Sequence, residues 1–148
     1  MGYLVDTNIL LRICQPDHPM YPIAEGAVET LLSQGEKLYT SPQNIVEFWN
    51  VCTRPLDKNG LGMRVEQASV EVTRVTALLP LKLDVPEIHQ QWRNLVTDYG
   101  VKGVNVHDTR LVAVCLVHGL TDILTFNVRD FRRYKEITVV HPDTVTDE

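Results

Sequence analysis

Several acidic side chains stand where they could do chemistry together. Asp6 lies in Asp6-Thr7-Asn8, directly after an apolar segment, and Asp108 precedes a long apolar run. Asp130 closes the stretch Asn127-Val128-Arg129-Asp130, and Glu47 lies between these segments. Acids gathered from distant parts of a chain would repel one another unless a cation joined them, and Mg²⁺ and Mn²⁺ prefer such oxygen ligands. The pattern therefore suggests metal-assisted phosphoryl chemistry.

Each of these segments also has a purely structural interpretation. Asp, Thr and Asn after a strand commonly cap the free N–H groups of a helix, which would account for Asp6-Thr7-Asn8 and for the stretch 127–130. Asp108 would interact favourably with the positive end of a helix. On a helical wheel Glu47 shares a face with other polar residues, namely Gln43, Asn50 and Arg54. That face is either solvated or the wall of a cleft, and helical phase does not separate the two.

Histidine chemistry is a rival hypothesis. His107, beside Asp108, could act as a general acid or base in a reaction that needs no metal. No two of the 5 histidines have a metal-ligand spacing such as HxxxH. The sequence also lacks a GxxxxGKS/T, GxGxxG or GxSxG motif, so nucleotide-driven and serine-hydrolase chemistry have no support.

The elements that must position these residues alternate along the chain. Short apolar strands are predicted at 2–5, 37–40, 81–83, 123–126 and 137–140. Helices are predicted at 23–32, 41–53, 65–79, 86–99 and 107–119. This alternation predicts an α/β fold, a parallel sheet flanked by helices on both faces. Ligands bind beyond the carboxyl ends of such strands, where Asp6 and Asn127 stand.

Length and composition restrict the class of protein. The chain has 148 residues, which fits one domain spanning 1–148. Its net charge of −5 argues against a nucleic-acid coat or a membrane-surface protein, but not against an enzyme that acts on nucleic acid through metal ions. The 3 cysteines are far apart, which argues against disulfides and fits a reducing cytoplasm. The longest apolar run, 111–117, is shorter than the ~20 residues of a membrane helix, so we expect a cytoplasmic protein without a membrane anchor.

Four segments, in order, carry a resemblance to a known family: Leu4-Val5-Asp6-Thr7-Asn8, Ile45-Val46-Glu47-Phe48-Trp49, His107-Asp108-Thr109-Arg110-Leu111-Val112-Ala113 and Leu124-Thr125-Phe126-Asn127-Val128-Arg129-Asp130-Phe131. They resemble PIN-domain proteins over essentially the whole chain. The length and the closing Val140-His141-Pro142 resemble the bacterial VapC-like toxins of toxin–antitoxin pairs. The resemblance implies a single PIN-like domain with a mainly five-stranded parallel sheet, acting as a Mg²⁺- or Mn²⁺-dependent endoribonuclease.

The resemblance assigns the acidic site to Asp6, Glu47 and Asp108, with Thr7 and Asn8 supporting the first acid. These acids would bind one or two cations, which would position a water as the phosphodiester is cut. Many relatives carry an Asp where this chain has Asn127. Asn127 offers a carbonyl oxygen without a charge, and Asp130 could serve as the fourth catalytic and metal-binding acid instead.

A basic run beside this site could hold RNA phosphates, and it consists of Arg129, Arg132, Arg133 and Lys135. It could equally be a solvated surface turn. Arg54 and Arg110 are further candidates for phosphate contacts.

The resemblance also implies partners, namely an RNA substrate, a small antitoxin protein and a second copy of the chain in a homodimer. A different hypothesis is a non-catalytic PIN-like binding or scaffold module, in which Asn127 marks a degraded metal site. The intact acids Asp6, Glu47 and Asp108 argue against it.

Overall fold

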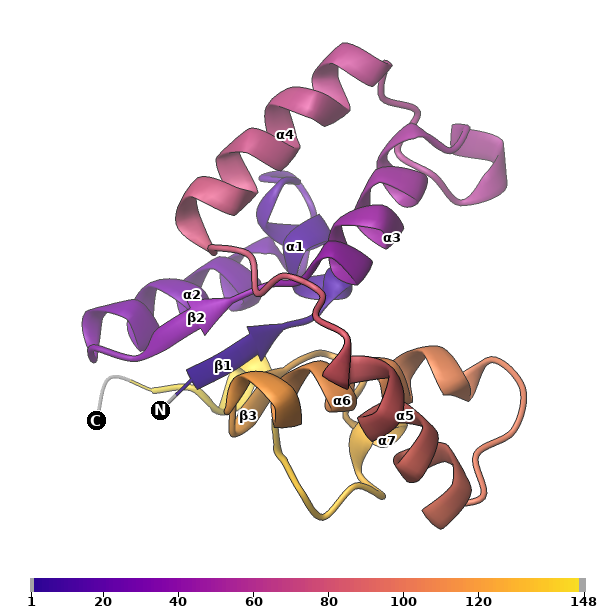
Figure 1. Cartoon of the computed structure of the whole chain (residues 1–148). Helices are drawn as coiled ribbons and strands as arrows, with labels where there is room; N and C mark the ends of the chain where they lie inside the picture. Colours follow the sequence, from indigo (N-terminus) through magenta and orange to yellow (C-terminus); the bar gives the residue numbers. More distant parts are fainter. Residues whose placement is uncertain (1, 147–148) are drawn as a thin grey trace.

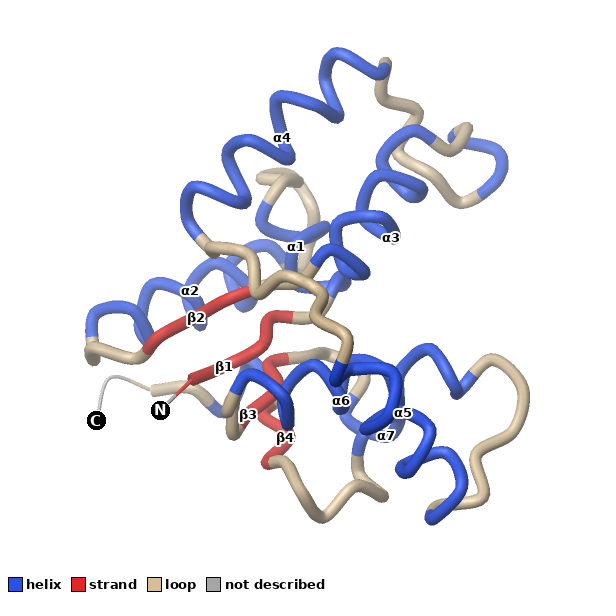
Figure 2. The backbone as a smooth tube through the Cα atoms, viewed as in Figure 1, coloured by secondary structure: helices blue, strands red, loops and turns tan. Residues whose placement is uncertain are grey.

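A computed structural model describes residues 2–146 as a parallel sheet between two layers of helices (Figures 1 and 2). The sheet has the strand order β2-β1-β3-β4, and all three neighbouring pairs are parallel. The strands are β1 (Gly2–Val5), β2 (Lys37–Tyr39), β3 (Asp122–Leu124) and β4 (Thr138–Val140). The register sets Leu4 opposite Ile123. The α/β prediction is confirmed.

The described sheet has four strands where five were expected. The predicted strand 81–83 contributes a single parallel bridge, between Thr40 and Leu81. The Thr40 N–H donates to the Pro80 carbonyl, and the Lys82 N–H donates to the Thr40 carbonyl. The chain then leaves the sheet edge with Leu83 exposed, so no buried apolar face holds this segment in the sheet.

The helices divide between the two faces of the sheet. One hydrophobic cluster unites α1 (Thr7–Ile13), α2 (Tyr21–Ser33), α3 (Pro42–Thr53) and α4 (Val65–Leu78). The other unites α5 (Glu87–Asp98), α6 (Asn105–His118) and α7 (Val128–Phe131). Two 3₁₀ turns, η1 (Leu56–Lys58) and η2 (Pro142–Thr144), complete the described elements. Figure 1 shows the first group above the sheet and the second below it.

Alternation along the central strands explains the two clusters. Leu4 packs into the α5–α6 cluster and Val5 into the α1–α4 cluster, although both are fully buried. Ile123 and Leu124 of β3 divide between the clusters in the same way. Successive side chains of a strand point to opposite faces, so a strand covered on both sides is apolar at every position.

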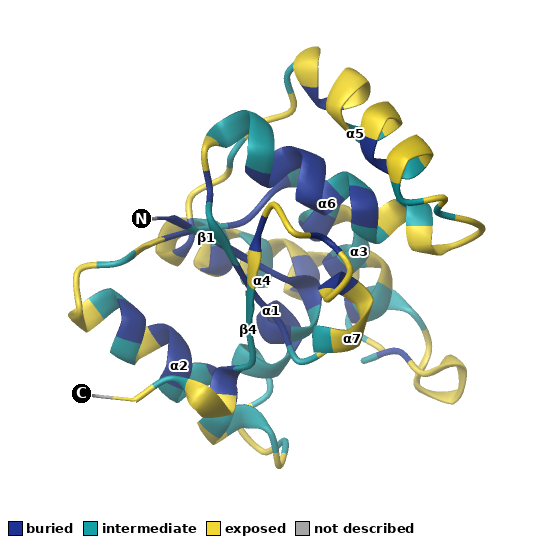
Figure 3. Cartoon of the chain, turned by 90° about the horizontal axis from the view of Figure 1, so that it is seen from below, coloured by how far each residue is buried: buried dark blue, intermediate teal, exposed yellow. Residues whose placement is uncertain are grey.

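The predicted helices are confirmed, with ends that shift by about one to two residues, as is usual for helix boundaries. Helix α6 is apolar on nearly all sides because it lies between the sheet and α5, and Figure 3 shows it largely buried while α5 exposes its outer side. Gly119 ends α6 in the left-handed region at φ 70°. The short helices α1 and α7 were not among the predicted helices. Within residues 2–146 no helix is both long and apolar enough to cross a membrane.

Candidate functional site

The predicted acids reach the carboxyl edge of the sheet from four elements. Asp6 follows β1 and caps the start of α1, and Glu47 lies in the middle of α3. Asp108 stands in the first turn of α6, and Asp130 in α7 beyond the end of β3. Burial is the main cause that raises the pKa of Asp6 and of Asp108; the charges of Glu47 and Asp130 add to the rise at Asp6, and those of all three other acids add to it at Asp108. The fold therefore gathers four segments that are far apart in the sequence.

Asp6 is the most constrained acid of the group. It is 7% exposed, and its Oδ1 accepts hydrogen bonds from the Thr7 N–H at 2.8 Å and from the Asn44 amide at 3.4 Å. Its Oδ2 accepts from the Thr125 hydroxyl at 2.8 Å and from the Asn8 amide at 3.4 Å. Burial raises the pKa of Asp6 to about 6, although the hydrogen bonds from Thr125 and Thr7 act to lower it.

Glu47 faces the site and not open solvent. The Thr7 hydroxyl donates to Glu47 Oε2 at 2.8 Å, and the Asn44 amide donates to the Thr7 hydroxyl at 3.1 Å. Asn44 is itself held by the Ser41 hydroxyl, which donates to its Oδ1 at 2.6 Å. The polar face of α3 is therefore the wall of the cluster at this point, and Thr7 joins the carboxylates of α1 and α3.

Asn44 and Thr125 belong to the site although sequence reasoning assigned them no role. Both are fully buried, and both donate to Asp6. Asn44 lies one helical turn before Glu47, a spacing that sets both side chains on one face of α3. Thr125 directly follows β3, at the same sheet edge as Asp6. These two positions are the sequence signals by which Asn44 and Thr125 could have been assigned to the site.

Asn8 ties the start of α1 to the end of β3. Its amide donates to the Thr125 hydroxyl at 3.1 Å, and its Oδ1 accepts from the Phe126 N–H at 3.1 Å. Thr7 and Asn8 both hydrogen-bond at this sheet edge, and their supporting role stays a prediction. The Asn127 N–H donates to the Thr125 hydroxyl at 3.0 Å, so the backbone of Asn127 joins the same network.

Asp108 and Asp130 form the more open side of the cluster. Asp108 is half-buried, and burial raises its pKa to about 7, with Asp130, Asp6 and Glu47 adding to the rise and Arg133 opposing it. Asp130 is exposed at the surface of α7. Within residues 2–146 no three acidic, histidine or cysteine side chains are close enough to hold a metal ion as they stand. Convergence on a cation would need side-chain rotation, which the exposure of Asp130 permits.

The basic candidates differ in their surroundings. Arg133 lies near enough to lower the pKa of Asp108 and stacks 5.7 Å from the Tyr134 ring centroid. Arg129 and Arg132 line a polar hollow of about 370 Å³ together with Asp130. Arg110, by contrast, is bound internally, since it donates to Gln43 Oε1 at 2.9 Å and pairs with Asp84 at 3.3 Å. His107 is exposed beside Asp108.

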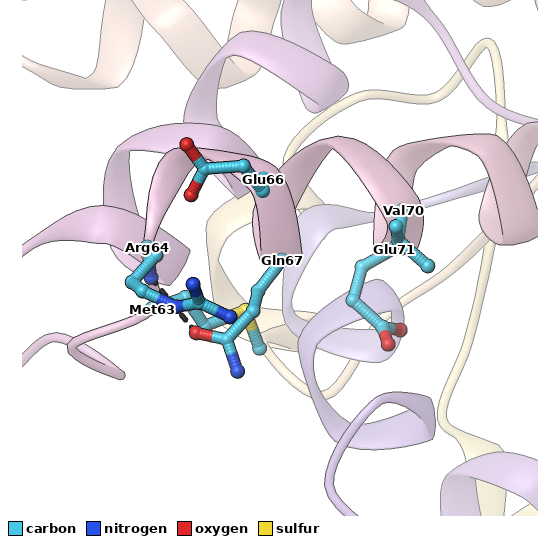
Figure 4. A pocket seen from close by; sticks show the side chains of 6 residues that line it. All are labelled: Met63, Arg64, Glu66, Gln67, Val70 and Glu71. Carbon is cyan, nitrogen blue, oxygen red and sulfur yellow. Dashed lines mark hydrogen bonds between the residues drawn. The ribbon is translucent and has the colours of Figure 1, made fainter.

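Another hollow, of about 270 Å³, opens at the start of α4 (Figure 4). Gln67 Oε1 accepts from the Arg64 N–H at 2.9 Å, and Figure 4 shows Glu66 and Glu71 pointing to opposite sides of the helix. Because its carboxylates do not converge, this hollow is not a second acidic site.

The sequence and the fold both match known proteins. Residues 3–137 match the PIN domain family. No protein of curated function matches by sequence. The fold is similar to a chain of VapBC2 from Rickettsia felis, bound to a DNA fragment from its promoter, with a TM-score of 0.70, 16% identity and coverage of 95% of this chain and 98% of that one.

Two further structures show the same fold. A chain of VapBC-1 from nontypeable Haemophilus influenzae has a TM-score of 0.67 and 19% identity, over 96% of this chain and 98% of that one. VapC20 of Mycobacterium tuberculosis, a sarcin-ricin loop cleaving toxin, has a TM-score of 0.59 and 14% identity, over 82% and 86%. At these identities the likeness shows the fold, and the family is shown by the match over residues 3–137. The chain belongs to the PIN domain family.

Proposed function

We propose that this PIN-domain protein is a metal-dependent endoribonuclease. The observation that carries the proposal is the gathering of Asp6, Glu47, Asp108 and Asp130 at one sheet edge, where burial, and then the charges of the neighbouring acids, raise the pKa values of Asp6 and Asp108. Such a cluster is unfavourable alone and suits a hard divalent cation with oxygen ligands. When bound, Mg²⁺ or Mn²⁺ would supply an acidified water and stabilise negative charge on the phosphate.

Different residues of the chain would have different roles in holding the cation and the RNA. Asp6 and Glu47 would hold the cation from a preset position, since Thr7, Asn44 and Thr125 fix their oxygens. Asn8 would support them by locking the end of β3 against α1.

Asp108 and Asp130 would complete the ligand set from α6 and α7. Asn127 would support the site through its backbone N–H, which donates to the Thr125 hydroxyl that in turn donates to Asp6. Arg133, Arg129 and Arg132 would hold RNA phosphates at the open side, since they lie beside these acids. Arg110 is tied to Gln43 and Asp84, so we assign it to the wall of the site.

The test is cleavage of a mixed structured RNA by the purified chain in Mg²⁺, in Mn²⁺ and in EDTA. We expect metal-dependent cleavage that is lost in Asp6→Asn and in Asp108→Asn while both variants remain folded. Asp57→Asn, an exposed charge removal in η1, is the matched control and should cut normally.

Other results of this experiment would support a different function. Full activity in Asp6→Asn or Asp108→Asn would refute the assignment of these acids to the catalytic site. Cleavage that survives EDTA and disappears in His107→Ala would indicate histidine chemistry. No cleavage in either metal, together with no Mn²⁺ binding at millimolar concentration, would favour the non-catalytic binding or scaffold module.

We further propose that the protein is the toxin of a toxin–antitoxin pair, acting in the cytoplasm as a homodimer inhibited by a small antitoxin. The support is the likeness to chains of VapBC complexes. Expression of the chain alone should arrest growth, and Asp6→Asn should not. A monomeric mass in light scattering would contradict the homodimer.

A further inference from the structure

An apolar pocket opens between the starts of α5 and α6, beside the acidic cluster. It encloses about 400 Å³ and is lined largely by apolar and aromatic side chains, among them Val85, Ile88, Trp92 and Val106. The Trp92 indole N–H donates to the Val106 carbonyl at 2.9 Å, which fixes the ring across the two helices. The His89 ring lies 5.9 Å from that of Trp92, at an exposed position.

The α5–α6 pocket adjoins a hollow that Glu47 of the acidic site lines. This second hollow, of about 460 Å³, is lined by Glu47 and Gln43 of α3 and by Asp84. The two hollows share His107 and Arg110, which flank Asp108 on α6. Glu47 and Trp92 therefore line neighbouring hollows, one on each side of this shared wall.

The shared wall is held by a polar network. Arg110 donates to Gln43 Oε1 at 2.9 Å, and the Gln43 amide donates to the His107 carbonyl at 2.8 Å. The Arg110–Asp84 pair, at 3.3 Å, extends the network to the segment before α5. The position of α3, which carries Glu47, relative to the pocket is thus set by hydrogen-bonded side chains.

We propose that the α5–α6 pocket binds an unpaired nucleobase of RNA next to the phosphodiester held at the acidic cluster. This inference rests on the proposed function and adds a subsite to it. The indole of Trp92 and the ring of His89 offer aromatic faces of the kind on which single-stranded bases stack. The pocket falls within the usual range for small-ligand sites, about 300–1,000 Å³, and it lies one shared wall from Glu47.

The occupant is an unpaired base because a paired base stays within its helical stack. Entry therefore requires a loop, a bulge or an end of the RNA. The pocket would select such single-stranded positions and set which neighbour of the scissile phosphate is recognised. An apolar side chain of a protein partner is the competing occupant, and the experiment must separate the two.

Tryptophan fluorescence tests the pocket without cleavage. The chain has 2 tryptophans, so Trp49→Phe leaves Trp92 as the reporter. In EDTA, this variant is titrated with short single-stranded oligoribonucleotides and with an abasic ribose-phosphate oligomer of equal length. We expect quenching by the base-bearing oligomers alone, because a stacked base quenches the indole. Equal quenching by the abasic oligomer, or none by either, would overturn the proposal.

Substitutions at two positions, Trp92 and His89, give an independent readout in filter binding. Trp92→Leu should weaken oligoribonucleotide binding about tenfold, whereas Trp92→Phe should hold it within about twofold, because aromatic stacking contributes strongly for each base. His89→Ala, at an exposed position that leaves the fold intact, should weaken binding about threefold. Gln90→Ala, exposed on α5 outside the pocket, is the control.

The outcomes for the pocket and for the nuclease are separable. If the wild type cuts RNA, and Trp92→Leu and His89→Ala bind oligoribonucleotides as tightly as the wild type does, the base-binding pocket is refuted and the proposed nuclease activity stands. If the wild type cuts nothing but quenching is base-dependent, the nuclease is refuted and the base site stands. If a purified antitoxin peptide quenches Trp92 and oligoribonucleotides do not, the pocket is a protein site and the proposal fails.

Discussion

Acidification should stabilise the metal-free protein, contrary to the usual behaviour of carboxylates. The pKa of Asp6 is about 6 in the folded chain against 3.8 for an ordinary Asp, so the folded state binds the proton more tightly than the unfolded state. Stability contributed by such a group is present at low pH and is lost as the pH rises through the folded pKa. The pKa of Asp108, about 7, acts in the same direction.

The magnitude follows from the two pKa values. From about pH 7.5 to about pH 5, the Asp6 linkage contributes about 1 kcal/mol to the free energy of unfolding. Asp108 is half-buried and screened by solvent, so we assign it about 1 kcal/mol. The sum, about 2 kcal/mol, corresponds to a rise of about 6 °C in Tm for a chain of this size. His18, whose pKa is lowered by desolvation and then by Arg12, opposes this trend.

The assay is urea denaturation followed by circular dichroism, in EDTA, at several pH values across this range. Asp6→Asn should lose about half of the pH dependence, and His18→Gln should increase it slightly. Mn²⁺ should reverse the trend, because a cation binds the ionised carboxylates and stabilises the fold more as the pH rises. A metal-free stability that falls steadily from neutral to mildly acidic pH would refute the buried, mutually repelling cluster, as would an unchanged slope in Asp6→Asn.

Two further predictions concern the fourth metal ligand and two glycines. Asn127→Asp should tighten Mn²⁺ binding about tenfold in calorimetry, because it adds a carboxylate to the site. Asp130→Asn should weaken Mn²⁺ binding about tenfold, because it removes one. Tighter Mn²⁺ binding by Asp130→Asn would exclude Asp130 from the site. Gly60→Ala should destabilise the fold, since a Cβ there would stand 1.9 Å from the Arg54 carbonyl oxygen, whereas Gly26→Ala, with open space inside α2, should stabilise it by about 1 kcal/mol in thermal melts.

The parts of the fold that the sequence predicts are those with a strong local signal. Continuous apolar runs such as Leu4-Val5 indicate strands covered on both faces, and the structure has them so. Helix α1 has only 7 residues, too few for a helical period to appear in a window of about 11–18 residues. The segment 81–83 fails as a strand for a non-local reason, because nothing buries Leu83 at the sheet edge.

Only part of the candidate site can be predicted from the sequence, for a related reason. Asp6 and Asp108 stand at the end of a strand and the start of a helix, where position alone suggests a ligand edge. Glu47 lies in the middle of a helix, and its position on the helical wheel is compatible with either a solvated face or the wall of a cleft. The hydrogen bond from the Thr7 hydroxyl shows that it faces the cluster. Arg110 shows the converse, since a basic residue beside the site is tied to Asp84. Both outcomes depend on partners distant in sequence.

The hydrogen bonds divide the acidic cluster into a preset half and an adaptable half. Asp6 accepts from four donors, and Glu47 is held through Thr7, so their oxygens cannot move without breaking buried bonds. Asp130 is exposed and can rotate at little cost. A cation would therefore be located by the preset half, and the adaptable half would supply whichever oxygen reaches it. On this reasoning an Asn at position 127 is tolerable, because the acid from α7 supplies charge without any change to the buried network.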